Sequence, residues 1–137
     1  MILADTSAWV EYDRATGSAV HRRLLQLVGS GQEELSVTEP VVMEVLAGAR
    51  SDQRERDLRR LLLRFSLLRF DAASDFEAAA RIYRRSRAAG ITPRGMVDCM
   101  IAAVAWRHGA SLLAQDVDLV RVCSVIGIPM DQASVRT

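Results

Sequence analysis

Lysine is absent from this sequence, and all eighteen basic residues are arginine, against seventeen acidic residues and a formal charge of +1. A phosphate-binding P-loop needs a lysine on the phosphates, so this class of site is excluded. Any other mechanism that requires a lysine is excluded for the same reason. A net charge this close to zero gives no indication by itself of a polyanionic partner.

Cysteine is scarce as well. The only two, Cys99 and Cys123, lie far apart in apolar surroundings and show no spacing typical of a metal site. Free, buried thiols are therefore expected, and these fit a reducing compartment. The sequence also lacks a charged leader and any apolar run long enough to span a bilayer. We therefore predict a cytoplasmic protein with no membrane partner.

Short apolar runs alternate with amphipathic segments along the whole chain. The runs that predict strands are 2–4, 35–38, 67–70 and 111–115, with a fifth candidate at 128–130. The segments that predict helices are 8–12, 20–28, 41–47, 51–65, 73–89, 93–108 and 117–126. This alternation predicts one domain over residues 1–137, a three-layer α/β/α fold around a mostly parallel sheet of four or five strands.

Several local signals refine this outline. Gly29, Ser30 and Gly31 predict the end of the second helix. Trp9 and Trp106 are predicted to pack in the core rather than to stack on bases. Helical spacing predicts that one face of segment 73–89 points inward, with Phe76, Ala79, Ala80 and Tyr83.

Arginines are concentrated on two predicted helices, at positions 54, 56, 59, 60 and 64 and at positions 81, 84, 85 and 87. Such basic faces are attractive RNA contacts, because phosphate contacts dominate the affinity for nucleic acids. Acidic residues are interspersed among these arginines, however, and we expect solvated faces instead.

Carboxylates appear at places where the pattern otherwise calls for apolar side chains. Asp5 and Asp116 each follow a buried strand, at the edge where open α/β sheets bind ligands. Their alternative role is to cap the helix that follows. Glu44 is the only charge between Glu39 and Arg50, and its alternative is the solvent-exposed side of a short helix.

Asp98 interrupts the most apolar helix of the sequence. With Thr92 as the cap and Pro93 in the first turn, Asp98 lies about six positions into the helix, beyond the reach of capping. A buried carboxylate costs several kcal/mol unless it is paired or binds a metal. Pairing with Arg94, one turn earlier, is the alternative to a metal-binding or catalytic role.

These four carboxylates lie close together in one arrangement. In it, the two that follow strands end neighbouring parallel strands, and the two on helices lie where those helices pack beside the strand ends. Oxygen ligands of this kind suit a hard divalent cation such as Mg²⁺. Attack of a metal-activated water on a phosphodiester is the reaction that such a site serves best.

Four stretches carry a resemblance to a known family: DTSAW, VVMEVLAG, PRGMVDCMIAAVAWRHGA and LLAQDVDL. In this order and spacing they resemble the PIN-domain nucleases and, more narrowly, the VapC toxins of type II toxin–antitoxin pairs. The resemblance covers essentially the whole chain. It implies a Mg²⁺- or Mn²⁺-dependent endoribonuclease that cleaves structured RNA, such as tRNA or rRNA, leaving a 5′-phosphate. The family's catalytic and metal-binding quartet falls on Asp5, Glu44, Asp98 and Asp116.

The resemblance also implies supporting residues. Thr6 or Ser7 matches the hydroxyl that helps to hold the first acid, and Asp118 is an additional or substitute ligand. Arg94 is suited to steady the third acid or an incoming phosphate. Ala114 stands where relatives commonly carry serine or threonine, which predicts an altered metal affinity rather than loss of the site.

Partners are implied by the resemblance alone. VapC relatives form homodimers and bind a cognate VapB-like antitoxin whose C-terminal segment covers the acidic cleft. A homodimer, an antitoxin and an RNA substrate are therefore expected. The alternative function is a catalytically silent PIN-like binding module, although such a module has no reason to retain buried carboxylates at such a cost.

Overall fold

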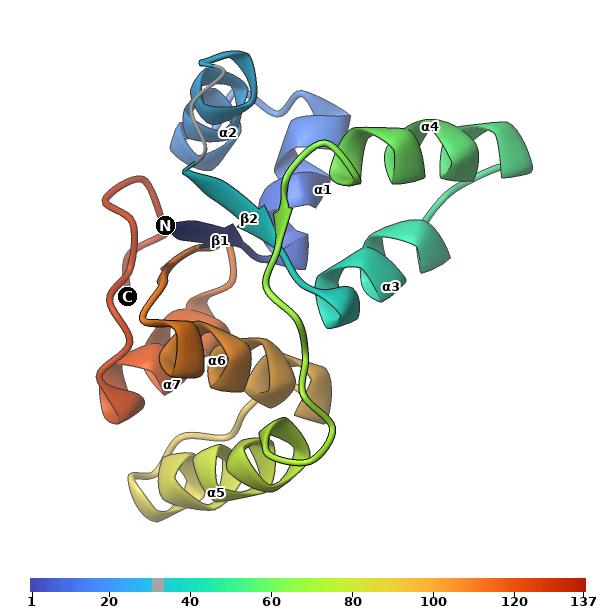
Figure 1. The fold of residues 1–137 in the computed structure, drawn as a ribbon. Helices are drawn as coiled ribbons and strands as arrows, with labels where there is room; N and C mark the ends of the chain where they lie inside the picture. The colour runs from blue at the N-terminus through green and yellow to red at the C-terminus, as the bar shows by residue number, and fades with distance from the viewer. Residues whose placement is uncertain (31–33) are drawn as a thin grey trace.

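The computed structural model describes residues 1–30 and 34–137 and contains a parallel sheet covered by helices (Figure 1). Within these residues the strands are β1 (Ile2–Ala4), β2 (Leu35–Val37), β3 (Ser66–Leu67) and β4 (Ser111–Leu113). Their order is β3-β2-β1-β4 and every pairing is parallel. The predicted fifth strand is reduced to a single parallel bridge between Leu112 and Met130.

The described helices alternate with these strands as the sequence predicts. They are α1 (Thr6–Arg14), α2 (Ala19–Gly29), α3 (Glu39–Ala47), α4 (Asp52–Leu62), α5 (Asp75–Ala88), α6 (Met96–His108) and α7 (Val117–Ile126). Figure 1 shows α1 and α2 on one side of the sheet and α6 and α7 on the other, with α5 packed outside α6. The predicted three-layer α/β/α architecture is confirmed.

Caps and buried apolar side chains account for these elements. Asp5, Ser18, Ser51 and Asp116 each accept a hydrogen bond from a backbone N–H of the helix that follows. α2 ends at Gly29, the first residue of the predicted stop, whereas Gly31 lies outside the described residues. Both cysteines are free and buried, as predicted. No helix in residues 1–30 and 34–137 is long and apolar enough to cross a membrane.

The predicted inward face of α5 is wrong in part. Phe76 is 55% exposed and Ala80 is exposed as well, whereas Ala79 is buried and Tyr83 half-buried. The buried stripe instead consists of Asp75, Ala79, Ile82 and Ser86. A buried ion pair at Asp75 fixes the rotation of the helix, and apolar spacing alone does not reveal such a pair.

Two predictions about α6 are wrong. Gly95, in an extended conformation, precedes the first helical residue, so the helix begins after Thr92 and Pro93 rather than at them. Asp98 therefore lies in the first turn, within reach of the helix dipole. Trp106 is 63% exposed near the other end of α6, whereas Trp9 is buried as predicted.

The ion pair between α5 and α6 links the outer layer to the core. Arg107 donates from Nε and Nη2 to the two carboxylate oxygens of Asp75, at 2.9 and 2.8 Å, and also to the carbonyl of Arg69. Burial favours a higher pKa for Asp75, but the hydrogen bonds from Arg107 and the Asp71 backbone outweigh it and lower the pKa. Asp75 is 1% exposed and therefore depends on this arginine for its charge.

Replacing Arg107 by Ala is expected to lower the free energy of unfolding by about 2 kcal/mol at neutral pH, because it leaves the Asp75 carboxylate buried and unpaired. Since pairing lowers the pKa of Asp75, its contribution is present above the ordinary carboxyl pKa and is lost as the pH falls below it. Urea unfolding at neutral and acidic pH measures both effects. The control is Arg121→Ala, which removes an exposed pair with Asp118. Equal stability losses in the two variants would contradict the prediction.

Candidate active site

The carboxyl ends of β1 and β4 meet α3 and the beginnings of α1, α6 and α7 at one edge of the sheet. A cavity of about 370 Å³ opens there. It is lined by Asp5, Thr6, Ser7, Val10, Glu11, Glu44, Arg94, Asp98, Gln115 and Asp116. The structure therefore brings the four carboxylates singled out in the sequence into a single cavity, together with Thr6, Ser7 and Arg94.

Asp5 is both a helix cap and a cavity residue. Its Oδ2 accepts hydrogen bonds from the Ser7 N–H at 3.0 Å and from the Ser7 hydroxyl at 2.6 Å. Its Oδ1 is buried and has no hydrogen-bond partner among the described residues. Burial raises the pKa of Asp5 to about 6, with further contributions from Asp116 and Glu44, although the Ser7 hydrogen bonds act in the opposite direction.

Asp98 shows the same combination of burial and missing partners. Its Oδ2 is buried and lacks a hydrogen-bond partner in the described part of the chain. Burial, followed by the charges of Asp5, Asp116 and Glu44, raises the pKa of Asp98 to about 7. The predicted alternative, an ion pair with Arg94, is not what the structure shows, because the Arg94 guanidinium is paired with Asp116 at 3.4 Å.

Glu44 and Asp116 are oriented by separate groups. The Thr6 hydroxyl donates to Glu44 Oε1 at 2.6 Å, so Glu44 is held from α1 rather than directed into solvent. Asp116 is 8% exposed, and its Oδ1 caps α7 by accepting from the N–H groups of Asp118 and Leu119. Asp116 therefore serves as a helix cap and as a cavity residue at once, because Oδ1 caps α7 while Oδ2 is paired with Arg94.

Ser7 connects two segments that are distant in the sequence. Its hydroxyl donates to Asp5 and accepts from the Gln115 N–H at 2.8 Å, which ties the start of α1 to the loop after β4. The sequence left open whether Thr6 or Ser7 holds the first acid, and in the structure it is Ser7. At Ala114, which lacks a hydroxyl, the backbone N–H donates to the buried Ser134 hydroxyl instead.

Two other positions differ from the sequence-based picture. Asp118 does not line the cavity, and its half-exposed carboxylate is paired with Arg121 at 3.8 Å. Glu11, which was not predicted as a site residue, does line the cavity. Its position in the sequence could have indicated this, because Glu11 lies one helical turn after Ser7 and therefore on the same face of α1.

The donor set fits a hard divalent cation. Two carboxylate oxygens, Asp5 Oδ1 and Asp98 Oδ2, are buried without hydrogen-bond partners, and oxygen donors are what Mg²⁺ and Mn²⁺ prefer. In residues 1–30 and 34–137, no three His, Cys, Asp or Glu side chains already form a metal-binding group. The fit therefore rests on the unpaired oxygens and on the burial and mutual repulsion that raise the pKa of Asp5 and Asp98.

Replacing Ser7 by Ala is expected to weaken Mn²⁺ binding by about tenfold, because the variant loses the hydroxyl that orients Asp5 and anchors the Gln115 loop. Calorimetric titration with MnCl₂ measures this change. Ser66→Ala, at an exposed position on β3, is the matched control and should bind Mn²⁺ like the wild type. Unchanged affinity in Ser7→Ala would show that Ser7 has no orienting role.

Comparison with known proteins gives a consistent result. The sequence pattern of the family described as PIN domain matches residues 2–125. The chain is 48% identical over 118 residues to Ribonuclease VapC11 of Mycobacterium tuberculosis, covering 86% of this chain and 88% of that protein. The family match includes all four cavity carboxylates, and the alignment with VapC11 covers most of this chain.

Solved structures share the fold at low sequence identity. The structure of VapBC2 from Rickettsia felis, bound to a DNA fragment from its promoter, contains a chain with a TM-score of 0.74 at 17% identity. The match covers 96% of this chain and 98% of that one. VapC20 from Mycobacterium tuberculosis, described as a sarcin–ricin-loop-cleaving toxin, has a TM-score of 0.71 at 20% identity and full coverage of both chains.

Proposed function

Since this chain belongs to the PIN domain family and, within it, to the VapC ribonucleases, we propose that it is a toxin that acts as a divalent-metal-dependent endoribonuclease on structured RNA, such as tRNA or rRNA. The observation that carries the proposal is the meeting of Asp5, Glu44, Asp98 and Asp116 in one cavity, where two buried carboxylate oxygens lack partners. A binding module gains nothing from such unpaired acids, whose burial costs stability.

We propose that Asp5 and Asp98 hold the cation through their unpaired oxygens and that Glu44 and Asp116 complete the set. Mg²⁺ or Mn²⁺, when bound, supplies charge neutralisation at the scissile phosphate and a water of lowered pKa. Asp118 is left outside this set, because its carboxylate does not reach the cavity lining.

The chain's own contribution is to fix the carboxylates before the substrate arrives. Ser7 holds Asp5, Thr6 holds Glu44, and the first turn of α7 holds Asp116. Groups that are oriented in advance need not reorganise when charge develops in the transition state.

Arg94 is proposed to bind the substrate phosphate. Its side chain is 71% exposed at the cavity, and its single contact with Asp116 is long, at 3.4 Å. A guanidinium donates two parallel hydrogen bonds to a phosphate and exchanges a weak carboxylate contact for it readily.

The partners are proposed from the family. We expect a VapB-like antitoxin, a homodimeric toxin and a cytoplasmic location, with residues 1–137 forming one PIN domain. Structural relatives that were solved as toxin–antitoxin complexes support the antitoxin.

The direct test is incubation of the purified protein with total tRNA and rRNA in MnCl₂ or MgCl₂, with EDTA as the control. Discrete cleavage products bearing 5′-phosphates are expected with the metal, and no products are expected with EDTA. Folded protein that cuts neither RNA in either metal would instead indicate the silent binding module.

A further inference from the structure

A second, smaller hollow adjoins the acidic cavity. Its volume is about 140 Å³, and it lies between α1, the second half of α3 and the middle of α4. The two hollows share Val10 and Glu44 in their linings, so they adjoin each other, and the pair lies between α1 and α3. We call this feature the α1–α3 groove. Its far end is lined by Arg14 and Arg50.

Charge is distributed unevenly along the α1–α3 groove. The cavity end carries five carboxylates and, among the described lining residues, one cation, Arg94. The far end carries Arg14 and Arg50, which are both exposed. Neither has an ion-pair or hydrogen-bond partner in residues 1–30 and 34–137. Their guanidinium groups therefore remain available to a ligand.

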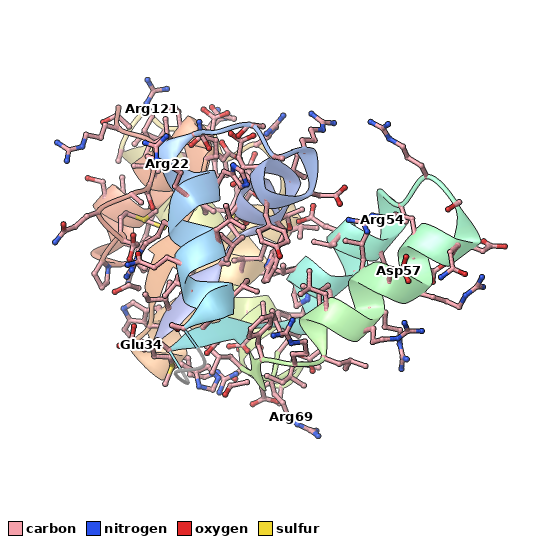
Figure 2. All side chains as sticks on the ribbon, turned by 90° about the horizontal axis from the view of Figure 1, so that it is seen from above. Arg22, Glu34, Arg54, Asp57, Arg69 and Arg121 are labelled. Atoms are coloured by element: carbon pink, nitrogen blue, oxygen red, sulfur yellow. The ribbon has the colours of Figure 1, made fainter. Side chains whose placement is uncertain are left out.

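The neighbouring arginine, Arg54, is already engaged. Arg54, labelled on α4 in Figure 2, is paired with Asp13, a further residue of the groove lining. Pairing removes much of the attraction that Arg54 has for phosphate, whereas Arg14 and Arg50 have no partner within the described part of the chain.

We infer that the α1–α3 groove is the path of the RNA strand, with Arg14 and Arg50 binding phosphates next to the one that is cleaved. The inference rests on the proposed ribonuclease function. The carboxylates repel the RNA phosphates on either side of the one that the cation contacts. Positively charged side chains are therefore needed next to those flanking phosphates. Arg94 supplies this charge in the cavity itself, and Arg14 and Arg50 supply it in the adjoining hollow.

A purely structural role for these arginines makes different predictions. Arg14 lies in the last turn of α1, where a cation suits the helix dipole, and its loss then affects only thermal stability. If they bind RNA, their loss lowers the affinity for RNA and changes how this affinity depends on salt concentration and on RNA length. Thermal unfolding does not measure these quantities.

The test compares Arg14→Gln/Arg50→Gln with Arg84→Gln/Arg87→Gln, which removes two exposed arginines of α5 that line neither hollow. Both pairs are made in an Asp5→Asn background so that RNA is not consumed. The probes are a labelled oligouridylate of about twelve nucleotides and a trinucleotide, followed by fluorescence anisotropy at several salt concentrations.

The groove variant is expected to bind the longer RNA about tenfold more weakly, with the slope of log K against log salt smaller by about 1.4, or 0.7 for each lost phosphate contact. The trinucleotide should bind alike to both, because it is too short to leave the cavity. Equal weakening by the α5 variant, or no weakening by the groove variant, would overturn the inference.

Cleavage assays separate this inference from the proposed function. Wild-type protein that does not cut tRNA or rRNA in MnCl₂ refutes the ribonuclease itself. For these assays Arg14→Gln/Arg50→Gln is made with Asp5 intact. If the wild-type protein cuts these RNAs and this variant has an unchanged KM, only the RNA path is refuted. A raised KM at nearly constant kcat in the groove variant supports it.

Discussion

Replacing Asp98 by Asn is expected to reduce RNA cleavage in MnCl₂ by about a thousandfold. The amide has nearly the shape of the carboxylate, so the packing of the first turn of α6 is retained. The negative charge is lost, however, and with it the oxygen that lies buried and unpaired beside Asp5, Glu44 and Asp116. A cation held by fewer charges supplies less stabilisation to the developing negative charge of the transition state.

The matched control is Asp118→Asn, which makes the same chemical change in the first turn of α7 but outside the cavity. Its rate should lie within about twofold of the wild type, because surface charges contribute little. Single-turnover cleavage of tRNA measures both variants. Full activity in Asp98→Asn would point to a contaminating nuclease and remove the basis for the proposed function.

In the absence of metal, Asp5→Asn is expected to be more stable than the wild type by about 3 kcal/mol at about pH 8. Burial raises the pKa of Asp5 to about 6 from the ordinary value of 3.8, so the folded state binds this proton more tightly than the unfolded state. Folding stability in the wild type therefore falls as the pH rises between these two values. The amide carries no charge, and its oxygen still accepts from Ser7.

Urea unfolding in EDTA, at about pH 8 and at about pH 4, measures this difference. The advantage of Asp5→Asn should shrink at the acidic pH, where the wild-type carboxyl is protonated. Saturating MnCl₂ should reverse the order, because only the wild type gains stability by binding the cation. A variant that is less stable than the wild type in EDTA at both pH values would show that Asp5 serves the fold rather than the site.

The four acids were predictable because each interrupts a local pattern. A carboxylate directly after an apolar strand, as at Asp5 and Asp116, or inside an apolar helix, as at Glu44 and Asp98, is visible within a few residues of sequence. Parallel topology then places the strand ends at one edge of the sheet. The start of α6 was missed because Thr92 and Pro93 offer stronger cap signals than Gly95, whose extended backbone precedes the helix.

The sequence by itself determined the order of strands and helices, the parallel sheet, the family and the identity of the clustered carboxylates. These features follow from the spacing of apolar and charged residues within each short segment of the sequence. Only the tertiary structure decided that Ser7 holds Asp5 while Thr6 holds Glu44, and that Arg94 pairs with Asp116. It also decided that Arg14 and Arg50 line a hollow that adjoins the cavity of the acids. Such pairings depend on distances between segments far apart in the chain, which local periodicity does not encode.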